Sequence, residues 1–283
     1  MSFKNTLLPV QCTIQSKGKL LDLSQPVVMG ILNATPDSFY TKGRYNSADG
    51  ILAQATAMIE SGAGILDIGG ASSRPGAAPV GVDEELARVI PAIESIHEHF
   101  PDIWLSIDTY NAVVAVAAVN AGAMIVNDIS AGTLDREMRA TVAGLQVPYI
   151  AMHMQGKPVD MQHNPTYDNI SSELLDYLQK VIQDCEEAGI TDVLVDPGFG
   201  FGKTIQQNYE LLNNMSLLRM LGKPVLAGIS RKSMIYKAIN ADADTALNGT
   251  TALHMVCLQQ GASILRVHDV KEAMEAIRLF KML

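Results

Sequence analysis

Eight short apolar runs, each followed by a polar or glycine-rich cluster, alternate along this chain with segments of helical periodicity. Alternating strands and helices form βαβ units and a parallel sheet, so eight units predict an α/β fold, the closed (β/α)8 or TIM barrel. Such barrels carry out their chemistry at the carboxyl ends of the strands. The eight runs are Val27–Asn33, Ile65–Gly70, Trp104–Thr109, Met124–Asp128, Pro148–His153, Val193–Gly198, Val225–Lys232 and Ile264–Asp269.

The length of 283 residues is normal for one barrel, and 48% hydrophobic residues can fill its core. We therefore expect residues 1–283 to form a single domain. Residues 10–24 predict an N-terminal β-hairpin, because alternating apolar residues flank a Lys-Gly-Lys turn. This hairpin is expected to cover the bottom of the barrel, at the amino ends of the strands.

Charge and cysteine content exclude several classes of protein. The net charge of −9 argues against broad binding to nucleic acid or to anionic membranes. No apolar run is long enough to span a bilayer and the first residues are polar, so we expect a cytoplasmic protein. The three cysteines have no metal-like spacing, and Cys185 and Cys257 fall in helical patterns, which predicts buried free thiols.

Two connections after strands are unusually long, residues 33–48 and residues 70–82. Both carry Gly and Pro at their turning points. Long loops at this end of a barrel are typical of lids or binding loops, since packing does not require them. We therefore predict that both loops border the active site.

Strand alternation places Arg266 and His268 on one face of the eighth strand, with Val267 on the other. Arg266 could stack on a planar ring, and both residues could contact an anion. A buried arginine that neutralises a barrel carboxylate is the alternative interpretation, and the strand by itself leaves both open.

Several strand ends supply polar groups suited to a flat heterocycle. Asp108, Asn127 and Asp196 end three of the runs, and Lys232 lies at the end of a fourth. Asp196 is the best candidate for a bidentate contact to an amino-pyrimidine edge. Lys232 could be a Schiff-base nucleophile, a carbonyl donor or a phosphate clamp, and its surroundings separate these roles only weakly.

Other candidates have ordinary structural interpretations as well. Asn33 could bind an anion or a hard cation, or it could form a turn into the long loop. His153, between two methionines, could border a ligand or pack in the core. The chain has no GxSxG, HExxH or paired Cys/His pattern, which disfavours hydrolase triads and zinc chemistry.

Taken together, the clusters resemble the dihydropteroate synthase family of the folate pathway. The resemblance covers the chain in order from Asn33 to Asp269, and each motif lies at or just after a predicted strand end. The matching segments are residues 33–39, 73–76, 107–109, 127–128, 152–156, 196–203, 230–233 and 266–269.

The resemblance implies an enzyme, a transferase in which para-aminobenzoate displaces pyrophosphate from a hydroxymethyl-dihydropterin pyrophosphate to give dihydropteroate. An electron-rich dihydropterin can stabilise a methylene cation, so the leaving group can depart before the amine attacks. The resemblance further implies Mg²⁺ as cofactor and a homodimer formed through the late helices.

The roles of the family fall onto matching residues of this chain. The pterin would be held by Asp108, Asn127, Asp196 and Lys232, with Arg266 stacked on its face. The pyrophosphate would be held by Asn33, Arg266 and His268, with the metal near Asn33. The aminobenzoate would be framed by Ser73, Arg74, Pro75 and Ser233, with Phe201 or Phe199 against its ring. The catalytic set would be Lys232, Arg266, His268 and Asp108.

Both long loops depart from the family pattern. Tyr40-Thr41-Lys42-Gly43 stands where Ser-Asp-Gly-Gly is expected, and Ala71 and Ser73 replace Glu and Thr. These changes bear on lid closure, aminobenzoate affinity and the response to sulfonamides, and they leave the pterin pocket unchanged. Two alternative functions are a pterin-dependent methyltransferase, which needs no pyrophosphate site, and a catalytically silent pterin-binding paralogue.

Overall fold

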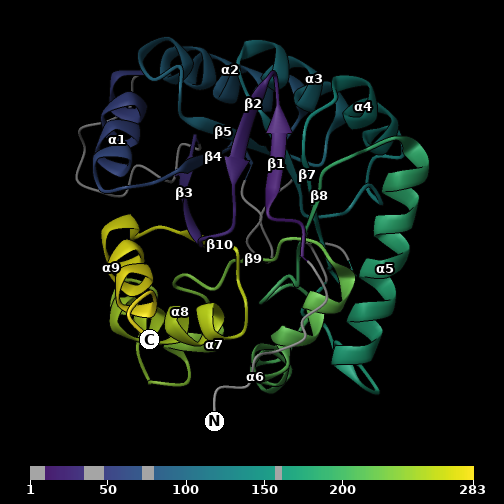
Figure 1. Ribbon diagram of the computed structural model, residues 1–283, viewed down its shortest axis with the longest axis vertical. Coiled ribbons are helices and arrows are strands. Elements are labelled where there is room, and N and C mark those ends of the chain that lie inside the picture. Colours follow the sequence, from purple (N-terminus) through teal and green to yellow (C-terminus); the bar gives the residue numbers. More distant parts are fainter. Residues whose placement is uncertain (1–9, 35–47, 72–79, 157–160) are drawn as a thin grey trace.

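The computed structural model describes residues 10–34, 48–71, 80–156 and 161–283, and within them the strands form a barrel. Eight parallel strands pair in the order β8-β7-β6-β5-β4-β3-β10-β9. A parallel bridge between Val195 and Val225 joins the two ends of this sheet. Helices surround the strands (Figure 1), and the predicted (β/α)8 barrel is confirmed.

The strands lie close to the eight apolar runs identified in the sequence. They are β3 (Val27–Asn33), β4 (Ile65–Gly69), β5 (Trp104–Asp108), β6 (Ile125–Asp128), β7 (Tyr149–Met152), β8 (Val193–Asp196), β9 (Leu226–Ala227) and β10 (Ile264–Val267). The exception is β9, which was predicted to reach Lys232. The chain leaves the sheet early because residues 229–232 turn, with Lys232 N donating to Ile229 O at 3.1 Å.

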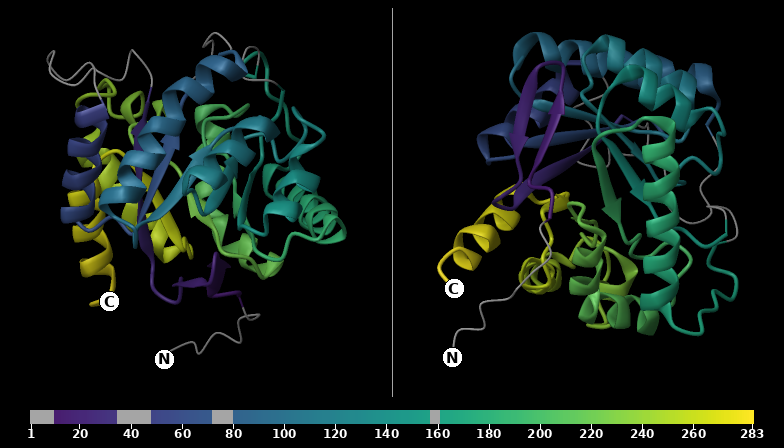
Figure 2. Two further views of the ribbon diagram at one scale, coloured as in Figure 1. Left: turned by 90° about the horizontal axis from the view of Figure 1, so that it is seen from above. Right: turned by 45° about the vertical axis from the view of Figure 1, so that its right-hand side comes forward.

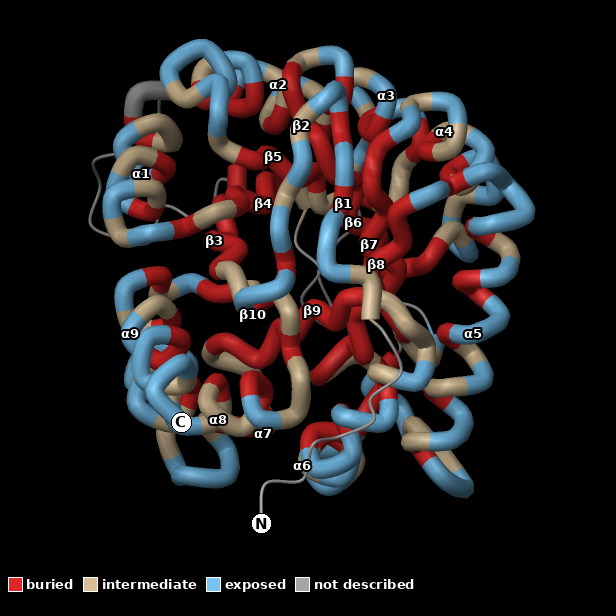
Figure 3. The backbone as a smooth tube through the Cα atoms, viewed as in Figure 1, coloured by how far each residue is buried: buried red, intermediate tan, exposed pale blue. Residues whose placement is uncertain are grey.

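At least one helix follows each barrel strand. The helices are α1 (Ala48–Glu60), α2 (Val82–His99), α3 (Ala112–Ala121), α4 (Met138–Leu145), α5 (Ile170–Ala188), α6 (Ile205–Asn213), the 3-10 helix η2 (Met215–Leu221), α7 (Ser233–Tyr236), α8 (Leu247–Gln259) and α9 (Val270–Phe280). Each turns an apolar stripe inward, so the helices are exposed outside and buried inside (Figure 3).

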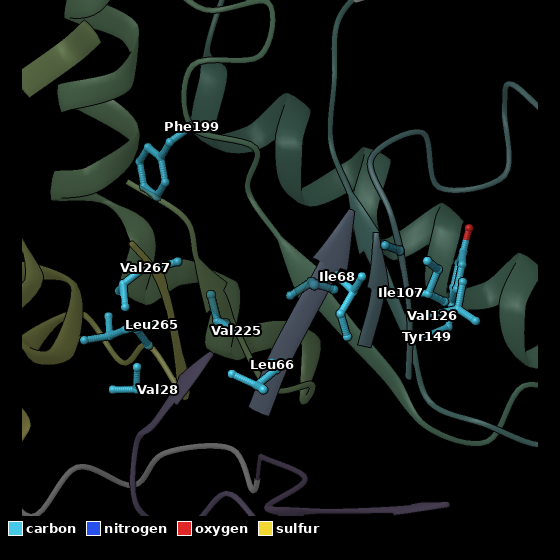
Figure 4. Packing of buried hydrophobic residues seen from close by; sticks show 14 of the residues in the cluster. Val28, Leu66, Ile68, Ile107, Val126, Tyr149, Phe199, Val225, Leu265 and Val267 are labelled. Atoms are coloured by element: carbon cyan, nitrogen blue, oxygen red, sulfur yellow. The ribbon is translucent and has the colours of Figure 1, made fainter. Parts of the chain in front are cut away.

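The larger hydrophobic core lies between the strands and the ring of helices. Outward-facing strand residues such as Val28, Leu66 and Leu265 contribute to it and are fully buried (Figure 4). Because side chains alternate along a strand, their neighbours point into the barrel. The interior therefore receives one set of residues from each strand, and these residues determine what the barrel can bind.

The N-terminal hairpin covers the amino-terminal end of the barrel, as predicted. It consists of β1 (Thr13–Ser16) and β2 (Lys19–Asp22), paired antiparallel, and it lies at one end of the molecule (Figure 2). Ile14 and Leu23 pack against the first inward-facing residues of the barrel strands. Asp192, just before β8, accepts the backbone N–H of Gln15 at 2.7 Å. The hairpin thus seals the bottom with an apolar plug.

Two further expectations concern the cysteines and membranes. Cys185 and Cys257 are buried free thiols, as predicted, whereas Cys12 is exposed. Among the helices of the described residues, none has the length and apolar character needed to cross a bilayer.

Candidate active site

The upper half of the barrel interior is polar and charged. Above the apolar layer sealed by the hairpin, the next inward-facing positions hold Asp67 on β4, Asn127 on β6 and Arg266 on β10. The predicted alternation on β10 is confirmed, since Val267 lies in the outer core. Strand pairing thus brings together side chains that are far apart in sequence.

Arg266 connects two carboxylates from neighbouring strands. Its Nε donates to Asp67 Oδ2 and its Nη2 donates to Asp108 Oδ2, both at 2.6 Å. Burial lowers the pKa of Arg266, but the two carboxylates outweigh it and hold the pKa above its ordinary value. The guanidinium is therefore cationic and fixed in orientation at the mouth of the barrel.

The same cluster makes Asp108 harder to ionise. Burial, opposed by the attraction of Arg266 and reinforced by the negative charge of Asp67, raises the pKa of Asp108 to about 7. A carboxyl group with this pKa changes its protonation state near neutral pH. Asp108 can therefore accept a hydrogen bond in one state and donate one in the other.

A pocket opens beside Arg266 at the carboxyl ends of the strands. Its lining is formed by Asn127, Ile129, Met152, Asp196, Phe201, Gly228, Lys232 and Arg266. Gly228 has no side chain, so the space beside Asp196 and Lys232 stays open. A Cβ at this position would occupy that space, 3.8 Å from Asp196 Oδ2 and 3.9 Å from Lys232 Nζ. The pocket thus presents a carboxylate, an amide and two cations to one ligand.

Burial governs the charges of Asp196 and Lys232. It raises the pKa of Asp196, which the nearby Lys232 opposes. It lowers the pKa of Lys232 to about 8, although Asp196 favours the ammonium form. The two residues therefore stabilise each other's charged forms, and a carboxylate in this position can pair with an amino-pyrimidine edge.

The loop after β8 positions Lys232 from the opposite side. Phe199 is fully buried in the core and its carbonyl oxygen accepts a hydrogen bond from Lys232 Nζ. The ring of Phe201 lies under the same ammonium group, with 4.6 Å from Nζ to the ring centroid. The sequence left Phe199 and Phe201 open as ligand contacts, and only Phe201 lines the pocket.

Lys203 and His153 hold this loop in place. Lys203 Nζ donates to the carbonyl oxygens of Gly198 and Phe201 at 2.9 and 3.0 Å and lies 3.0 Å from His153 Nδ1. Only glycine fits at position 198, because its φ is +68° and a Cβ there would lie 1.9 Å from the carbonyl oxygen of His153, the residue that follows β7. Of the two interpretations of His153, the structure favours packing in the core, because the side chain is buried, contacts Tyr177 edge-on and does not line the pocket.

His268 and Asn33 lie at the edge of the barrel mouth. Ser230 Oγ lies 3.0 Å from His268 Nδ1 and accepts the backbone N–H of His268 at 3.2 Å. Asn33 Oδ1 and Asp108 Oδ2 both lie close to Gly69. A Cβ built on that glycine would be 3.8 Å from each of the two oxygens. Asn33 on β3 and Asp108 on β5 thus lie on either side of Gly69, at the end of the strand between them, and both carry oxygen atoms of the kind that hard cations prefer.

The residues expected around an aminobenzoate are described only in part. Ser233 is the first residue of α7 and follows Lys232 directly. Ser73, Arg74 and Pro75 lie outside the described residues, as do residues 40–43 of the first long loop.

The sequence reasoning did not single out Asp67. It is the one charged residue within the apolar run Ile65–Gly70. The alternation that was applied to Arg266 and His268 would have placed Asp67 inside the barrel as well, because it is two positions after the inward-facing Ile65. A carboxylate at such a position needs a buried partner, and an interior arginine is the obvious one.

A family model described as "Pterin binding enzyme" matches residues 29–268, which is most of the barrel. The fold and the pocket therefore belong to the class of pterin-binding barrel enzymes. The dihydropteroate synthase of Haemophilus influenzae is 44% identical over 270 residues, which cover 95% of this chain and 98% of the relative.

Two solved structures agree with this relationship. The Yersinia pestis dihydropteroate synthase, solved in a sulfonamide drug complex, has a TM-score of 0.91 and 43% identity over 95% of this chain and 98% of its own. The Xanthomonas albilineans enzyme, solved with 4-aminobenzoic acid, has a TM-score of 0.90 and 40% identity over 96% and 98%. The chain belongs to the dihydropteroate synthase family, and the predicted transferase function is confirmed.

Proposed function

We propose that this chain joins para-aminobenzoate to hydroxymethyl-dihydropterin pyrophosphate in the pocket at the barrel mouth, releasing pyrophosphate. The observation that carries this proposal is the pocket lined by Asn127, Asp196, Lys232 and Arg266. It combines a carboxylate and an amide for the hydrogen-bonding edge of a pterin with cations for a leaving anion.

Pterin binding is assigned to the interior of the pocket. The Asp196 carboxylate accepts two N–H groups of the amino-pyrimidine edge, and Asn127 and Asp108 take part in the remaining hydrogen bonds. Lys232 donates to a ring heteroatom from its position between Phe199 O and the Phe201 ring. Arg266 stacks on the face of the bicyclic ring, as a planar guanidinium can.

The leaving group is assigned to the outer edge of the pocket. Arg266, His268 and Asn33 hold the pyrophosphate, and the first two stabilise the charge that grows as the C–O bond breaks. The methylene cation that remains draws electrons from the dihydropterin ring. Since an aniline nitrogen is nucleophilic when neutral, the amine then forms the C–N bond and releases one proton. No strong general base is needed for this order of events.

Aminobenzoate binding is assigned to the side of the pocket near α7. Ser233 hydrogen-bonds the substrate, and the Phe201 ring packs against it. Ser73, Arg74 and Pro75 are assigned to the same site and complete it. The two long loops exclude water from the methylene cation. The second of them carries Ala71 and Ser73, which differ from the family pattern.

A Mg²⁺ ion fits the residues at the rim. No group of three or more His, Cys, Asp or Glu side chains suited to a metal occurs in the part of the chain that the structure describes. Mg²⁺ commonly needs only one or two protein ligands beside substrate phosphates and water, and we assign one of them to Asn33 Oδ1 at the end of β3. When bound, the ion neutralises charge on the pyrophosphate.

We also propose that two copies form a homodimer through the late helices. Seven of the large apolar side chains that are exposed in the described residues come from position 205 onward, among them Met220 and Ile239. An interface between two copies would cover such side chains where they gather on one face of the molecule. The cytoplasmic location and the single-domain organisation of residues 1–283 stay predictions from the sequence.

The test is pyrophosphate release by the purified protein with dihydropterin pyrophosphate and Mg²⁺, with and without para-aminobenzoate. We expect release coupled one-to-one to dihydropteroate formation. Tight pterin binding without release, even with para-aminobenzoate, would instead identify a silent paralogue. Failure to bind the pterin at all would contradict the assignment of the pocket.

A further inference from the structure

Asp67 is a buried carboxylate for which the proposed chemistry has no role. It lies in the middle of β4 with none of its surface exposed. Its neighbours Leu66 and Ile68 belong to the outer core, so Asp67 faces the barrel interior. Burial of a charged group is costly unless it is paired and hydrogen-bonded, which makes its contacts informative.

A single oxygen of Asp67 holds two residues of the pocket. Asp67 Oδ2 accepts Arg266 Nε at 2.6 Å and Asn127 Nδ2 at 3.0 Å. The other oxygen, Oδ1, is buried and has no hydrogen-bond partner among the described residues. The Asp67 side chain has no exposed surface and does not line the pocket, whereas the Asp108 side chain, also outside the lining, is 12% exposed. Asp67 therefore acts on a ligand only through the two side chains that it holds.

The contact with Asn127 determines which end of that amide faces the pocket. A carboxylate can only accept hydrogen bonds, so the amide nitrogen must point to Asp67. The amide oxygen is then left for the ligand. An acceptor in the pocket selects a ligand N–H, whereas a rotated amide would present donors to the same group and leave it unpaired.

The contact with Arg266 fixes the plane of the guanidinium. Asp67 holds Nε and Asp108 holds Nη2, so carboxylates on two adjacent strands prevent rotation about the last bonds of the side chain. A planar cation stacks on a ring only when its own plane is set. Both effects of Asp67 therefore concern orientation.

We propose that Asp67 is a positioning residue that turns the Asn127 amide oxygen toward the pterin and fixes the stacking plane of Arg266. The inference rests on the proposed function, because it takes the pterin to be the ligand of this pocket. It adds a residue outside the pocket lining that determines which hydrogen-bonding pattern the pocket accepts.

The test is a double-mutant cycle of Asp67→Ala and Asn127→Ala, with the Kd for dihydropterin pyrophosphate measured by calorimetry. We expect Asp67→Ala to weaken binding by at least about tenfold alone, and by several-fold less when Asn127 is already alanine, because the two residues act as one unit. Independent, multiplying effects would overturn the proposal. They are what a general loss of structure would produce.

A conservative variant separates orientation from folding. Asp67→Asn keeps an oxygen that can accept both N–H groups, so we expect its Kd to lie within about fivefold of wild type. Asp128→Asn is the matched control, since Asp128 is a fully buried carboxylate bound to Tyr149 and Ser130, outside the pocket lining. An Asp67→Asn protein that loses binding as severely as Asp67→Ala, while Asp128→Asn keeps it, would contradict the role of the oxygen.

A second measurement applies if Asp67→Ala does not fold. Asn127→Asp places two carboxylates against each other and should weaken binding by at least about tenfold. Adding Asp67→Asn removes the repulsion and should restore most of the affinity, whereas no restoration would overturn the proposal. Wild-type protein that fails to bind the pterin would instead show that the proposed function itself is wrong.

Discussion

Of the two interpretations of Arg266, neutralisation of barrel carboxylates is the one that the structure shows, and stacking on a ligand ring stays a proposal. Arg266 neutralises barrel carboxylates, Asp67 and Asp108, and it also lines the pocket. These roles are compatible because the carboxylates bind the edge of the guanidinium and leave a face for a ligand. A buried cation that is already paired needs no reorganisation when an anion forms beside it, which is the condition for effective electrostatic catalysis.

The raised pKa of Asp108 predicts a pH dependence of pterin binding. Burial shifts this pKa upward to about 7, so the carboxylate that accepts a pterin N–H is lost as the pH falls below that value. Affinity for the dihydropterin pyrophosphate should then fall by about tenfold per pH unit on the acid side. Calorimetry as a function of pH measures this, and a Kd that is flat from about pH 5.5 to 7.5 contradicts it.

The control for this dependence is Asp108→Asn. Its amide cannot titrate, so the acid limb should disappear even though binding is weaker at every pH. The groups that surround Asp108 are Arg266, Asp67, Glu85 and Asp128. An acid limb that persists in Asp108→Asn would assign the titration to another group, and the terminal phosphate of the ligand and Asp196 are the first to examine.

Lys232→Ala should lower kcat by about a hundredfold, the effect of removing one donor aimed at the reacting system. The reason is the fixed position of Nζ, between the Phe199 carbonyl and the Phe201 ring. The exposed Lys237, on the same segment, provides the matched control, and Lys237→Ala should keep wild-type rates. Steady-state kinetics of both variants measure this effect. An unchanged kcat in Lys232→Ala would remove Lys232 from the catalytic set.

At the scale of elements, apolar runs ending in polar residues were sufficient to predict the barrel strands. The prediction was wrong about the length of β9, where a local turn competes with the sheet. Gly228 and Ile229 continue the apolar run, but the chain turns from Ile229 to Lys232 and leaves the sheet. Asp67 was missed because its partners lie on β6 and β10, and only the closed barrel brings them close. Periodicity indicates which face a residue occupies and does not identify its contacts.

The hairpin should contribute to stability and not to chemistry. Ile14 is 1% exposed and plugs the bottom of the barrel, so Ile14→Ala should cost about 2–5 kcal/mol of unfolding free energy. Leu20 in the same hairpin is 72% exposed, and Leu20→Ala should change stability by less than about 0.5 kcal/mol. Denaturant unfolding measures both. A large loss of kcat in folded Ile14→Ala would contradict the separation of the two ends of the barrel.

At the scale of the whole molecule, the barrel has its apolar plug at one end and the polar pocket at the other, and the proposed dimer would use the outer surface of the helices. The described pocket lining lies at the ends of the strands and in the loops that follow them. We therefore expect pairing through the late helices to leave each pocket complete, so that assembly and turnover can be separated by mutation.

Ile239, which follows α7 and is 51% exposed, is the residue on which to test this separation. Wild-type protein should sediment at twice the mass of one chain, and Ile239→Glu should sediment as a monomer, because a buried unpaired charge opposes association. Leu20→Glu, at the hairpin, should leave the dimer intact. Because Ile239 does not line the pocket, monomeric Ile239→Glu should keep its affinity for dihydropterin pyrophosphate within about threefold. Wild-type protein that sediments as a monomer at every concentration contradicts the dimer, and a folded monomer that loses pterin binding contradicts the independence of the pocket.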